Sequence, residues 1–408
     1  MQACGLVVEY NPFHNGHVYH IEQSKIESGA DCIIAVMSGS FLQRGEPAII
    51  DKFHRAQAAL SGGADIVLEL PYVFSVQGSS YFADGAVRIL HELGVDTLCF
   101  GSESGDIKKF EHGYEQLSHN FTEYRSVLKE SLSEGMSFPT ASKRAYKSVG
   151  LDSEHMDLAK PNNILGFSYV RSIRDRTLPI RSLTIQRTKS NYHDPSIVHD
   201  IASATSIRNE IKQHKCVTTD AARALPNTMR DMLTSYKAVA SIWHDWEHYF
   251  PYLHYKVVTM TLSELACIHG VDEGLEHRIK KTAKTAESFE AWITALKTKR
   301  YTRTRLQRMF VHILTGTTKT DMARMSDPNA SLPYVRILGM TKNGQAYLNK
   351  VKKTMQVPLI TKLSNSVCDM LAHEERVSNV YYSILPPGAR KRLFKQELSG
   401  PVLMNASH

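Results

Sequence analysis

Two histidines near the start of the chain have the clearest chemical potential. They stand three positions apart, as His14 and His17, with Asn15 and Gly16 between them. Each imidazole can donate a hydrogen bond to a phosphate oxygen or carry positive charge against it. We therefore expect the pair to hold a triphosphate and to stabilise the charge on departing pyrophosphate. Because a His-x-Gly-His sequence also occurs by chance, two surface histidines in a helix cap are the alternative.

The residues around this pair predict a strand, a sharp turn and a helix. Residues 6–8 are an apolar run typical of a buried parallel strand, and Asn11-Pro12 is a turn signal that ends it. Asn15 is the expected N-cap of the helix, and Gly16 leaves space beside it. A strand that leads straight into a helix directs free N–H groups and the positive helix dipole at an anion. A metal site is less favoured, because no cysteine or carboxylate stands at ligand spacing from the histidines.

Strand and helix patterns alternate over the first two hundred residues. Apolar runs at 31–37, 66–70, 97–100 and 182–185 are each followed by a polar loop. This alternation predicts right-handed βαβ crossovers and an α/β fold with a Rossmann-like, doubly wound parallel sheet. Ligands of such sheets bind at the carboxyl ends of the strands. The residues that follow each strand are therefore the candidates for chemistry.

Several polar residues occupy these loop positions. The loop after the second strand contributes Ser40, Gln43, Arg44, Glu46 and, slightly further on, Lys52. Gly101 ends the fourth strand, and Arg187 stands just beyond the fifth. A plainer interpretation exists for these residues, since Arg44 and Glu46 could simply form a surface ion pair.

Two further segments open predicted helices. In residues 160–166, two amides, Asn162 among them, and a lysine could contact an adenine edge or a ribose, or simply cap the helix. Ser203 and Thr205 place hydroxyls at the start of another helix, with Arg208 one turn inside it. That arrangement is typical of a second phosphate site, and a plain cap with an exposed arginine is the alternative.

The positive charge of the chain is concentrated in one segment. The formal net charge is +8, and residues 277–312 contain ten lysines and arginines but only two acids, so this segment alone accounts for it. Such a segment indicates a polyanionic partner. Basic side chains with a tyrosine among them suit contact with an RNA backbone and stacking of bases, although a solvated charged face is the alternative. The candidates for RNA contact are Lys297, Lys299, Arg300, Tyr301, Arg303, Arg305 and Arg308.

Length and composition set the broader organisation. A chain of 408 residues predicts two or three domains. Strand signals fade after about residue 217, which predicts a nucleotide-binding domain at 1–216 and a mainly helical RNA-binding domain at 217–408. No apolar run is long enough for a membrane helix, and no secretory signal is apparent. Six scattered cysteines without a Cys-x-x-Cys motif favour reduced thiols in the cytoplasm over disulfides or zinc.

Five segments together resemble a known family. They are Asn11-Pro-Phe-His-Asn-Gly-His17, Met37-Ser-Gly39, Gln43-Arg-Gly-Glu-Pro47, Lys160-Pro-Asn-Asn-Ile-Leu-Gly166 and Ser203-Ala-Thr-Ser-Ile-Arg208. The combination resembles the bacterial tRNA(Met) cytidine acetate ligases, which belong to the HxGH nucleotidyltransferase superfamily, and the resemblance extends over almost the whole chain. Two positions differ from the family pattern, with Ser40 in place of an asparagine and Phe53 in place of a tryptophan.

The resemblance implies an activity and a set of site residues. The family is thought to activate acetate with ATP as acetyl-adenylate, and then to acetylate the exocyclic amine of the wobble cytidine in elongator tRNA(Met). It implies that His14, His17 and Arg208 stabilise the phosphates. It also implies contacts with ATP from the histidine turn and from loops at the ends of later strands: Val7, Val8, Glu9, Tyr10, Asn11, Pro12, Phe13, His14, Asn15, Gly16, His17, His20, Gly101, Asn162, Arg187, Thr188, Ser203 and Thr205. Ser40 and its loop are the candidates for the acetate pocket.

Two other functions share part of this pattern. A small-molecule adenylyltransferase would use the same phosphate motifs but would not need the basic segment. A non-catalytic RNA-binding protein would use the basic segment but should not bind ATP, and the intact His14 and His17 argue against it. Participation of Mg²⁺ is left open, because no dedicated carboxylate cluster is visible in the sequence. Neither a membrane nor a protein partner is indicated.

Overall fold

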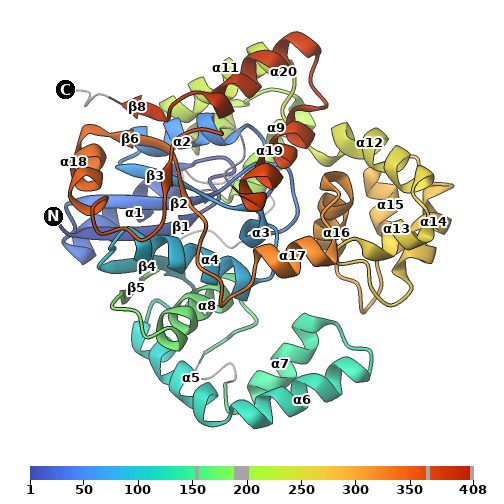
Figure 1. Ribbon diagram of the computed structural model, residues 1–408, viewed down its shortest axis with the longest axis horizontal. Helices are drawn as coiled ribbons and strands as arrows, with labels where there is room; N and C mark the ends of the chain where they lie inside the picture. Colours follow the sequence, from blue (N-terminus) through green and yellow to red (C-terminus); the bar gives the residue numbers. More distant parts are fainter. Residues whose placement is uncertain (152–155, 188–201, 364–367, 405–408) are drawn as a thin grey trace.

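One mixed, mostly parallel sheet forms the centre of the molecule (Figure 1). The computed structural model describes residues 1–151, 156–187, 202–363 and 368–404. Within these residues the sheet contains β1 (Ala3–Val8), β2 (Cys32–Ser38), β3 (Ile66–Leu70), β4 (Thr97–Ser102), β5 (Arg181–Gln186), β6 (Val335–Thr341), β7 (Leu359–Ile360) and β8 (Val402–Met404). The main strand order is β5-β4-β1-β2-β3-β6-β7, and β8 pairs with another part of β6.

The first five strands are parallel and confirm the predicted doubly wound α/β fold. Strands β1, β2 and β3 follow one another in one direction, whereas β4 and β5 lie on the other side of β1. The strand order therefore reverses between β1 and β4. A reversal of this kind opens a crevice at the carboxyl ends of the two strands, where ligands of such sheets bind.

Helices connect these strands and flank the sheet. They are α1 (Asn15–Ser28), α2 (Lys52–Ser61), α3 (Tyr72–Ser75), α4 (Ser79–Glu92), α8 (Pro161–Asp175), α9 (Ala204–His214) and α10 (Thr219–Arg223). The central strands carry almost only buried apolar residues, as expected for a parallel sheet that is covered on both faces. Gly5 in β1 lies so close to Leu90 of α4 that a Cβ at this position would overlap the leucine side chain.

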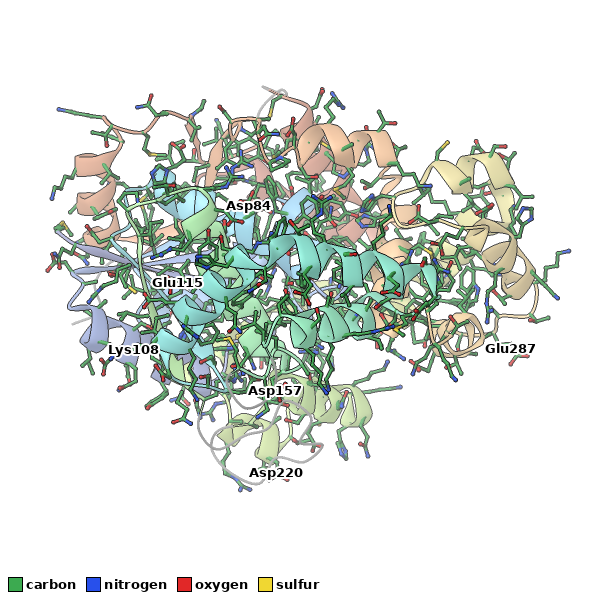
Figure 2. The ribbon with its side chains drawn as sticks, turned by 90° about the horizontal axis from the view of Figure 1, so that it is seen from below. Asp84, Lys108, Glu115, Asp157, Asp220 and Glu287 are labelled. Carbon is green, nitrogen blue, oxygen red and sulfur yellow. The ribbon has the colours of Figure 1, made fainter. Side chains whose placement is uncertain are left out.

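Residues 106–149 contain three helices rich in charged residues, α5 (Ile107–His119), α6 (Phe121–Ser133) and α7 (Phe138–Ser148). Figure 2 shows them from below, where they cross the near face of the molecule with Lys108 and Glu115 of α5 on one side. Glu287 lies at the opposite end of the same view. The two charged helical regions therefore occupy separate parts of the molecule.

The second half of the chain is mainly helical. Its helices are α11 (Asn227–Ala240), α12 (Trp246–Thr259), α13 (Leu262–Cys267), α14 (Leu275–Ala283), α15 (Phe289–Leu296), α16 (Arg303–Thr315), α17 (Lys319–Met325), α18 (Lys342–Val351), α19 (Asp369–Tyr382), α20 (Pro387–Phe394) and a 3₁₀ turn at Lys395–Leu398. No helix in the described ranges is long and apolar enough to cross a membrane.

A short irregular segment separates α11 from α12. The helix stops at Ala240 because Ser241 adopts a left-handed conformation, with φ of 66°. Asp245 then caps a new helix by accepting hydrogen bonds from the backbone N–H groups of Glu247 and His248. A second break follows between Thr259, the last residue of α12, and Leu262, the first residue of α13.

Strands from the end of the chain complete the sheet. β6 pairs with β3 in an antiparallel direction, and Glu69 lies opposite Arg336 in this pairing. The division into domains at 1–216 and 217–408 stays a prediction, and the sheet contains strands from both ranges. A strand from the second range, β6, therefore pairs directly with β3 of the first range.

A buried ion network joins these late strands to the first half. Lys52 Nζ lies 2.6 Å from Glu69 and 3.0 Å from Glu397, and Arg336 lies 2.9 Å from Glu69 and 2.8 Å from Glu397. Ser378 donates a further hydrogen bond of 2.7 Å to Glu397. All four charged side chains are almost completely shielded from solvent. Two positive and two negative charges therefore compensate one another in the core.

Candidate active site

His14 itself caps the first helix, which corrects the prediction that Asn15 is the N-cap. The Nδ1 atom of His14 accepts a hydrogen bond of 3.1 Å from the backbone N–H of Gly16. His17 returns the interaction, since its Nδ1 accepts a hydrogen bond of 3.2 Å from the backbone N–H of His14. The two imidazoles thus form a capping box, a role that serine and glutamate usually fill. Asn15 is the first helical residue, and its side chain donates to the carbonyl of Arg223.

This arrangement fixes the chemical state of both imidazoles. Because each Nδ1 accepts a backbone hydrogen bond, the proton of the neutral ring must lie on Nε2. Burial lowers the pKa of His14 to about 3, with a further contribution from Arg187 and Arg208. Burial also lowers the pKa of His17 well below its usual value, and the neighbouring His14 adds to the effect. The rings are stacked with centroids 3.6 Å apart. The pair is therefore organised as two neutral Nε2–H donors.

The turn before α1 is held rigid by aromatic packing. Tyr10 has a left-handed backbone with φ of 49°, which is uncommon for a residue with a side chain. Its ring contacts Phe13 edge-to-face at 4.7 Å and His17 at 4.8 Å. Asn11 accepts a hydrogen bond of 2.7 Å from the backbone of Ile49. The other predicted contacts in this segment lie along β1, the turn and α1, namely Val7, Val8, Pro12, Gly16 and His20.

Two arginines from distant segments approach the histidine turn. Arg208 of α9 donates a hydrogen bond of 2.6 Å to the carbonyl of Asn11. Arg187 follows β5, where its backbone N–H bonds to Ser102 and its side chain passes beside Gly101 of β4. The structure thus brings His14, His17, Gly101, Arg187 and Arg208 to the crevice between β1 and β4. Thr188, the neighbouring predicted contact, lies outside the described residues.

The second predicted phosphate motif is correctly placed but already has partners. Ser203 caps α9 by accepting the backbone N–H of Ser206 at 3.1 Å. Arg208 forms an ion pair of 3.1 Å with Glu46 and lies 3.5 Å from the hydroxyl of Thr205. The surface pair that we considered between Arg44 and Glu46 is therefore replaced by a pair between Glu46 and Arg208. This contact connects α9 to the loop after β2.

The side-chain amide of Asn162, at the start of α8, is hydrogen-bonded to an acidic residue. Asn162 donates a side-chain hydrogen bond of 2.7 Å to Glu103, which follows β4. Glu103 also accepts the backbone N–H of Asn163 at 2.8 Å, so it binds the N-terminus of α8. Asn163 in turn accepts the backbone N–H groups of Glu103 and Ser104. The hydrogen bond to Glu103 therefore fixes the orientation of the Asn162 amide before any nucleotide binds to it.

The loop after β2 connects the crevice to the helical half. The backbone N–H of Gln43 donates to Glu9 at 2.7 Å, while Trp246 Nε1 donates to the carbonyl of Gly45 at 3.0 Å. Gly45 has a left-handed backbone with φ of 73°, and a Cβ there would overlap the backbone of Gln307 and Arg308 in α16. Arg44 is half-buried, and Ser40 lies buried at the base of the loop. The loop is therefore clamped between the turn and α16.

Lys52 is the loop candidate that the structure does not bring to the crevice. Its ammonium group is enclosed with Glu69 and Glu397 in the buried network, and its side chain is 1% exposed. A lysine enclosed between two buried carboxylates is not available to a small anion. Lys52 is the first residue of α2, after the N-cap Asp51, and its side chain is buried in the core. The sequence around Lys52 does not show this direction.

Arg55 is a structural residue of the crevice that sequence reasoning missed. Its fully buried guanidinium donates to the carbonyls of Glu9 at 2.6 Å and Ser38 at 3.0 Å, and also to that of Gly39. It thereby joins the carboxyl ends of β1 and β2. The sequence shows that Arg55 belongs to an amphipathic helix. It does not show that the side chain binds the carbonyl groups at the ends of two strands.

The predicted RNA-contacting residues lie on α16 and the turn before it, but acids accompany them. Arg303 forms a two-point ion pair with Glu290, at 2.6 and 2.7 Å. Arg300 pairs with Glu273, which also accepts a hydrogen bond of 3.1 Å from Tyr301. Arg305 lies 3.6 Å from Asp272, and burial lowers the pKa of Arg308 to about 10. Lys297 and Lys299 are exposed. The segment is thus less purely positive than its sequence indicates.

The buried histidines make stability depend on pH. Burial lowers the pKa of His14 and of His244 to about 3. The unfolded forms protonate near the ordinary value of about 6.5, so acidification favours the unfolded chain between these values. Lowering the pH from about 7.5 to about 5 should therefore remove about 2 kcal/mol of unfolding free energy for each residue. Urea titrations at both pH values measure this loss.

His244→Gln is the variant that isolates one contribution. It should reduce the difference between the two pH values by about 2 kcal/mol, because one buried imidazole no longer titrates. His112→Gln on the exposed side of α5 is the matched control and should leave the difference unchanged. An equal pH dependence in all three proteins would contradict the assignment of His244 as a neutral buried imidazole.

Comparison with known proteins places this geometry in a family. A sequence model described as HIGH nucleotidyl transferase matches residues 1–397, and the chain belongs to that family. Among its relatives, the tRNA(Met) cytidine acetate ligase of Oceanobacillus iheyensis is 52% identical and that of Geobacillus sp. is 46% identical. Both alignments cover 99% of this chain and 100% of the relative. The resemblance to tRNA(Met) cytidine acetate ligases that the sequence motifs indicated is thereby confirmed.

Solved structures agree with this result. Thermotoga maritima TmcAL in its apo form is 32% identical, with a TM-score of 0.90 and coverage of 100% of both chains. The same protein bound with alpha-thio ATP matches with a TM-score of 0.88 and the same identity and coverage. Among the residues described in our structure, no group of three or more histidine, cysteine or acidic side chains is arranged to hold a metal ion.

Proposed function

We propose that this protein is an ATP-dependent ligase that acetylates the exocyclic amine of the wobble cytidine in elongator tRNA(Met). The ligase class and the use of ATP, both predicted from the sequence, agree with the names of the relatives and with the nucleotide analogue in the Thermotoga structure. Acetate as the second substrate, the wobble cytidine as the acceptor and the cytoplasm as the location are parts of the proposal. The observation that carries it is the pair of neutral imidazole donors at the switch point of the sheet.

The first step would form acetyl-adenylate. A carboxylate oxygen of acetate attacks the α-phosphorus of ATP, the bond to the β-phosphate oxygen breaks, and pyrophosphate leaves. The Nε2–H groups of His14 and His17 can donate to the phosphate oxygens, and Arg208 and Arg187 add positive charge at the same crevice. Because the donors are fixed by the capping box before ATP binds, little reorganisation is needed during the step.

The second step would transfer the acetyl group to RNA. The N4 amine of the cytidine attacks the acetyl carbonyl, AMP leaves with the bonding electron pair, and the amine loses one proton. The reacting base must leave its stack, which an anticodon loop permits at low cost. In Figure 1 the helices α12–α16 lie to the right of the sheet, and hydrogen bonds of the loop at residues 40–47 reach both Glu9 at the end of β1 and Trp246 of α12.

Two measurements test the proposal. The protein is incubated with ATP, labelled acetate and total tRNA, and the tRNA is digested to nucleosides. Label in an acetylated cytidine supports the proposal, whereas transfer of AMP to a small acceptor without labelled tRNA would support an adenylyltransferase instead. Exchange of labelled pyrophosphate into ATP that depends on acetate tests the first step without RNA.

Reversal of charge on the basic segment tests its role in binding RNA. The double substitution Arg300→Glu and Arg303→Glu replaces two attractive charges and faces each new acid with Glu273 or Glu290. We expect tRNA affinity to fall by at least tenfold at low salt and the salt dependence to flatten, because fewer counterions are released. Filter binding over a range of salt concentrations measures both. Unchanged binding would exclude this surface from the RNA site.

A further inference from the structure

A groove of about 440 Å³ lies between the nucleotide crevice and the helical half. One end is lined by Thr205 and Arg208 of α9, and the other by Phe289 and Arg303 of α15 and α16. The segment that joins α11 to α12 forms another wall. In Figure 1, α9 lies between the strands of the sheet and α12. The volume is within the range of pockets that hold small organic ligands, and one nucleotide is of this size.

The acids of the groove already have donors from the protein. Glu46 pairs with Arg208, and Glu290 pairs with Arg303. Glu247 accepts the first backbone N–H groups of α15, at 3.0 and 3.2 Å. Because protein donors already occupy these carboxylates, they do not require the lysines of the groove as partners. They do not prevent a polyanion from binding to the other side of the groove.

Three lysines line the opposite side. They are Lys212 and Lys215 at the end of α9 and Lys237 near the end of α11. Lys212 lies 3.5 Å from Asp245, and solvent screens this pair at the lysine, whose side chain is 59% exposed, whereas that of Asp245 is 28% exposed. Over the described residues, no carboxylate forms an ion pair with Lys215 or Lys237. In the described residues, the positive charge of these two ammonium groups is therefore not neutralised by a carboxylate, and Lys237 donates one hydrogen bond to the carbonyl of Lys215.

Trp243 supplies an aromatic surface beside these lysines. The side chain is half-buried, and its Nε1 donates a hydrogen bond of 3.0 Å to the carbonyl of Leu233, which fixes the ring. Lys237 Nζ lies 4.1 Å from the centre of the ring and also donates to the carbonyl of Lys215 at 2.6 Å. A fixed indole with an ammonium group against its ring combines the aromatic surface and the positive charge with which proteins hold single-stranded nucleic acid.

We propose that this groove binds the RNA strand next to the reacting nucleotide, with Lys212, Lys215 and Lys237 on phosphates and Trp243 stacked on a base. This inference rests on the proposed function and extends it to a surface that adjoins the basic segment at Arg303. One end of the groove is at Arg208, which also lies at the nucleotide crevice. When one base of the RNA occupies the groove, the next nucleotide of the strand therefore lies close to the adenylate. The RNA strand thus enters between α9 and α12.

Binding of a labelled oligocytidylate of about nine nucleotides tests the groove, because one such strand is long enough to span it. The triple substitution of Lys212, Lys215 and Lys237 by glutamine should weaken binding roughly tenfold or more at low salt. It should also reduce the slope of log K against log salt by about 2, since each lost phosphate contact removes about 0.7. The matched control replaces Lys350, Lys352 and Lys353, at the end of α18, and should change neither quantity.

Two tryptophan variants separate stacking from charge. Trp243→Ala should weaken binding about tenfold without changing the salt slope, while Trp243→Phe should retain most of the affinity because a ring remains. Circular dichroism and thermal melting show that each variant is folded. Unchanged affinity in both the triple lysine variant and Trp243→Ala would overturn the proposal. Acetate-dependent pyrophosphate exchange by the unaltered protein, measured without RNA, shows independently whether the proposed function holds.

Discussion

Replacing His17 with glutamine should lower acetate-dependent pyrophosphate exchange by about 100- to 1000-fold, the usual effect of removing one fixed donor to developing charge. Glutamine can still accept the backbone N–H of His14, because glutamine is a common partner in a capping box. The amide oxygen is then committed to the helix end, and an amide N–H on a flexible chain replaces the rigid imidazole Nε2–H beside the phosphates. The variant therefore removes the fixed imidazole donor and retains the start of α1.

Three controls separate the loss of the phosphate donor from a loss of RNA binding or of folding. The affinity for tRNA should stay nearly unchanged, because the basic helices lie in another part of the molecule. His17→Ala, which loses both the donor and the cap, should be inactive and also less stable by about 1 kcal/mol. His112→Gln on the exposed face of α5 should retain full exchange. Normal exchange by His17→Gln would show that the imidazole is dispensable for forming the adenylate.

The nucleotide crevice was predictable because its signals are local. Each strand is a short apolar run, each loop is polar, and the sheet class follows from their alternation. The N-cap was assigned wrongly to Asn15, since asparagine is a frequent cap whereas an imidazole acceptor is not. The reciprocal bonds of His14 and His17 depend on backbone geometry that a list of residue types does not contain.

Contacts between distant segments could not be predicted in this way. An apolar run such as residues 335–341 does not specify its partner strand, so the antiparallel pairing of β6 with β3 was not apparent. The basic segment seemed poor in acids because Asp272 and Glu273 precede it in the sequence, and folding places them beside Arg305 and Arg300. Lys52 was assigned to a loop that could bind acetate, whereas its partner Glu397 lies near the other end of the chain.

Replacing Arg336 with methionine should cost about 3–5 kcal/mol of unfolding free energy, the range observed when one member of a buried ion pair is removed. The substitution leaves Glu69 and Glu397 with Lys52 as their one remaining cation in the network. Two carboxylates that share one ammonium group in the core are poorly compensated. Urea titration followed by circular dichroism measures the loss. Arg144→Met, which removes an exposed pair with Glu134, is the matched control and should cost less than about 1 kcal/mol.

A second substitution shows whether charge or packing causes the loss. Adding Glu397→Gln to Arg336→Met restores the balance of one positive and one negative charge between Lys52 and Glu69, so the double variant should recover part of the lost stability. Glu397→Gln alone should be destabilising, because it leaves Arg336 and Lys52 with only Glu69. If the two losses simply add, the network is not coupled through charge, and the effect of Arg336→Met belongs to its packing against Phe53. Losses that do not add would instead show that Glu397 stabilises two parts of the fold through charge, namely the pairing of β6 with β3 through Arg336 and the position of α2 through Lys52. The same helix carries Arg55, which joins the ends of β1 and β2.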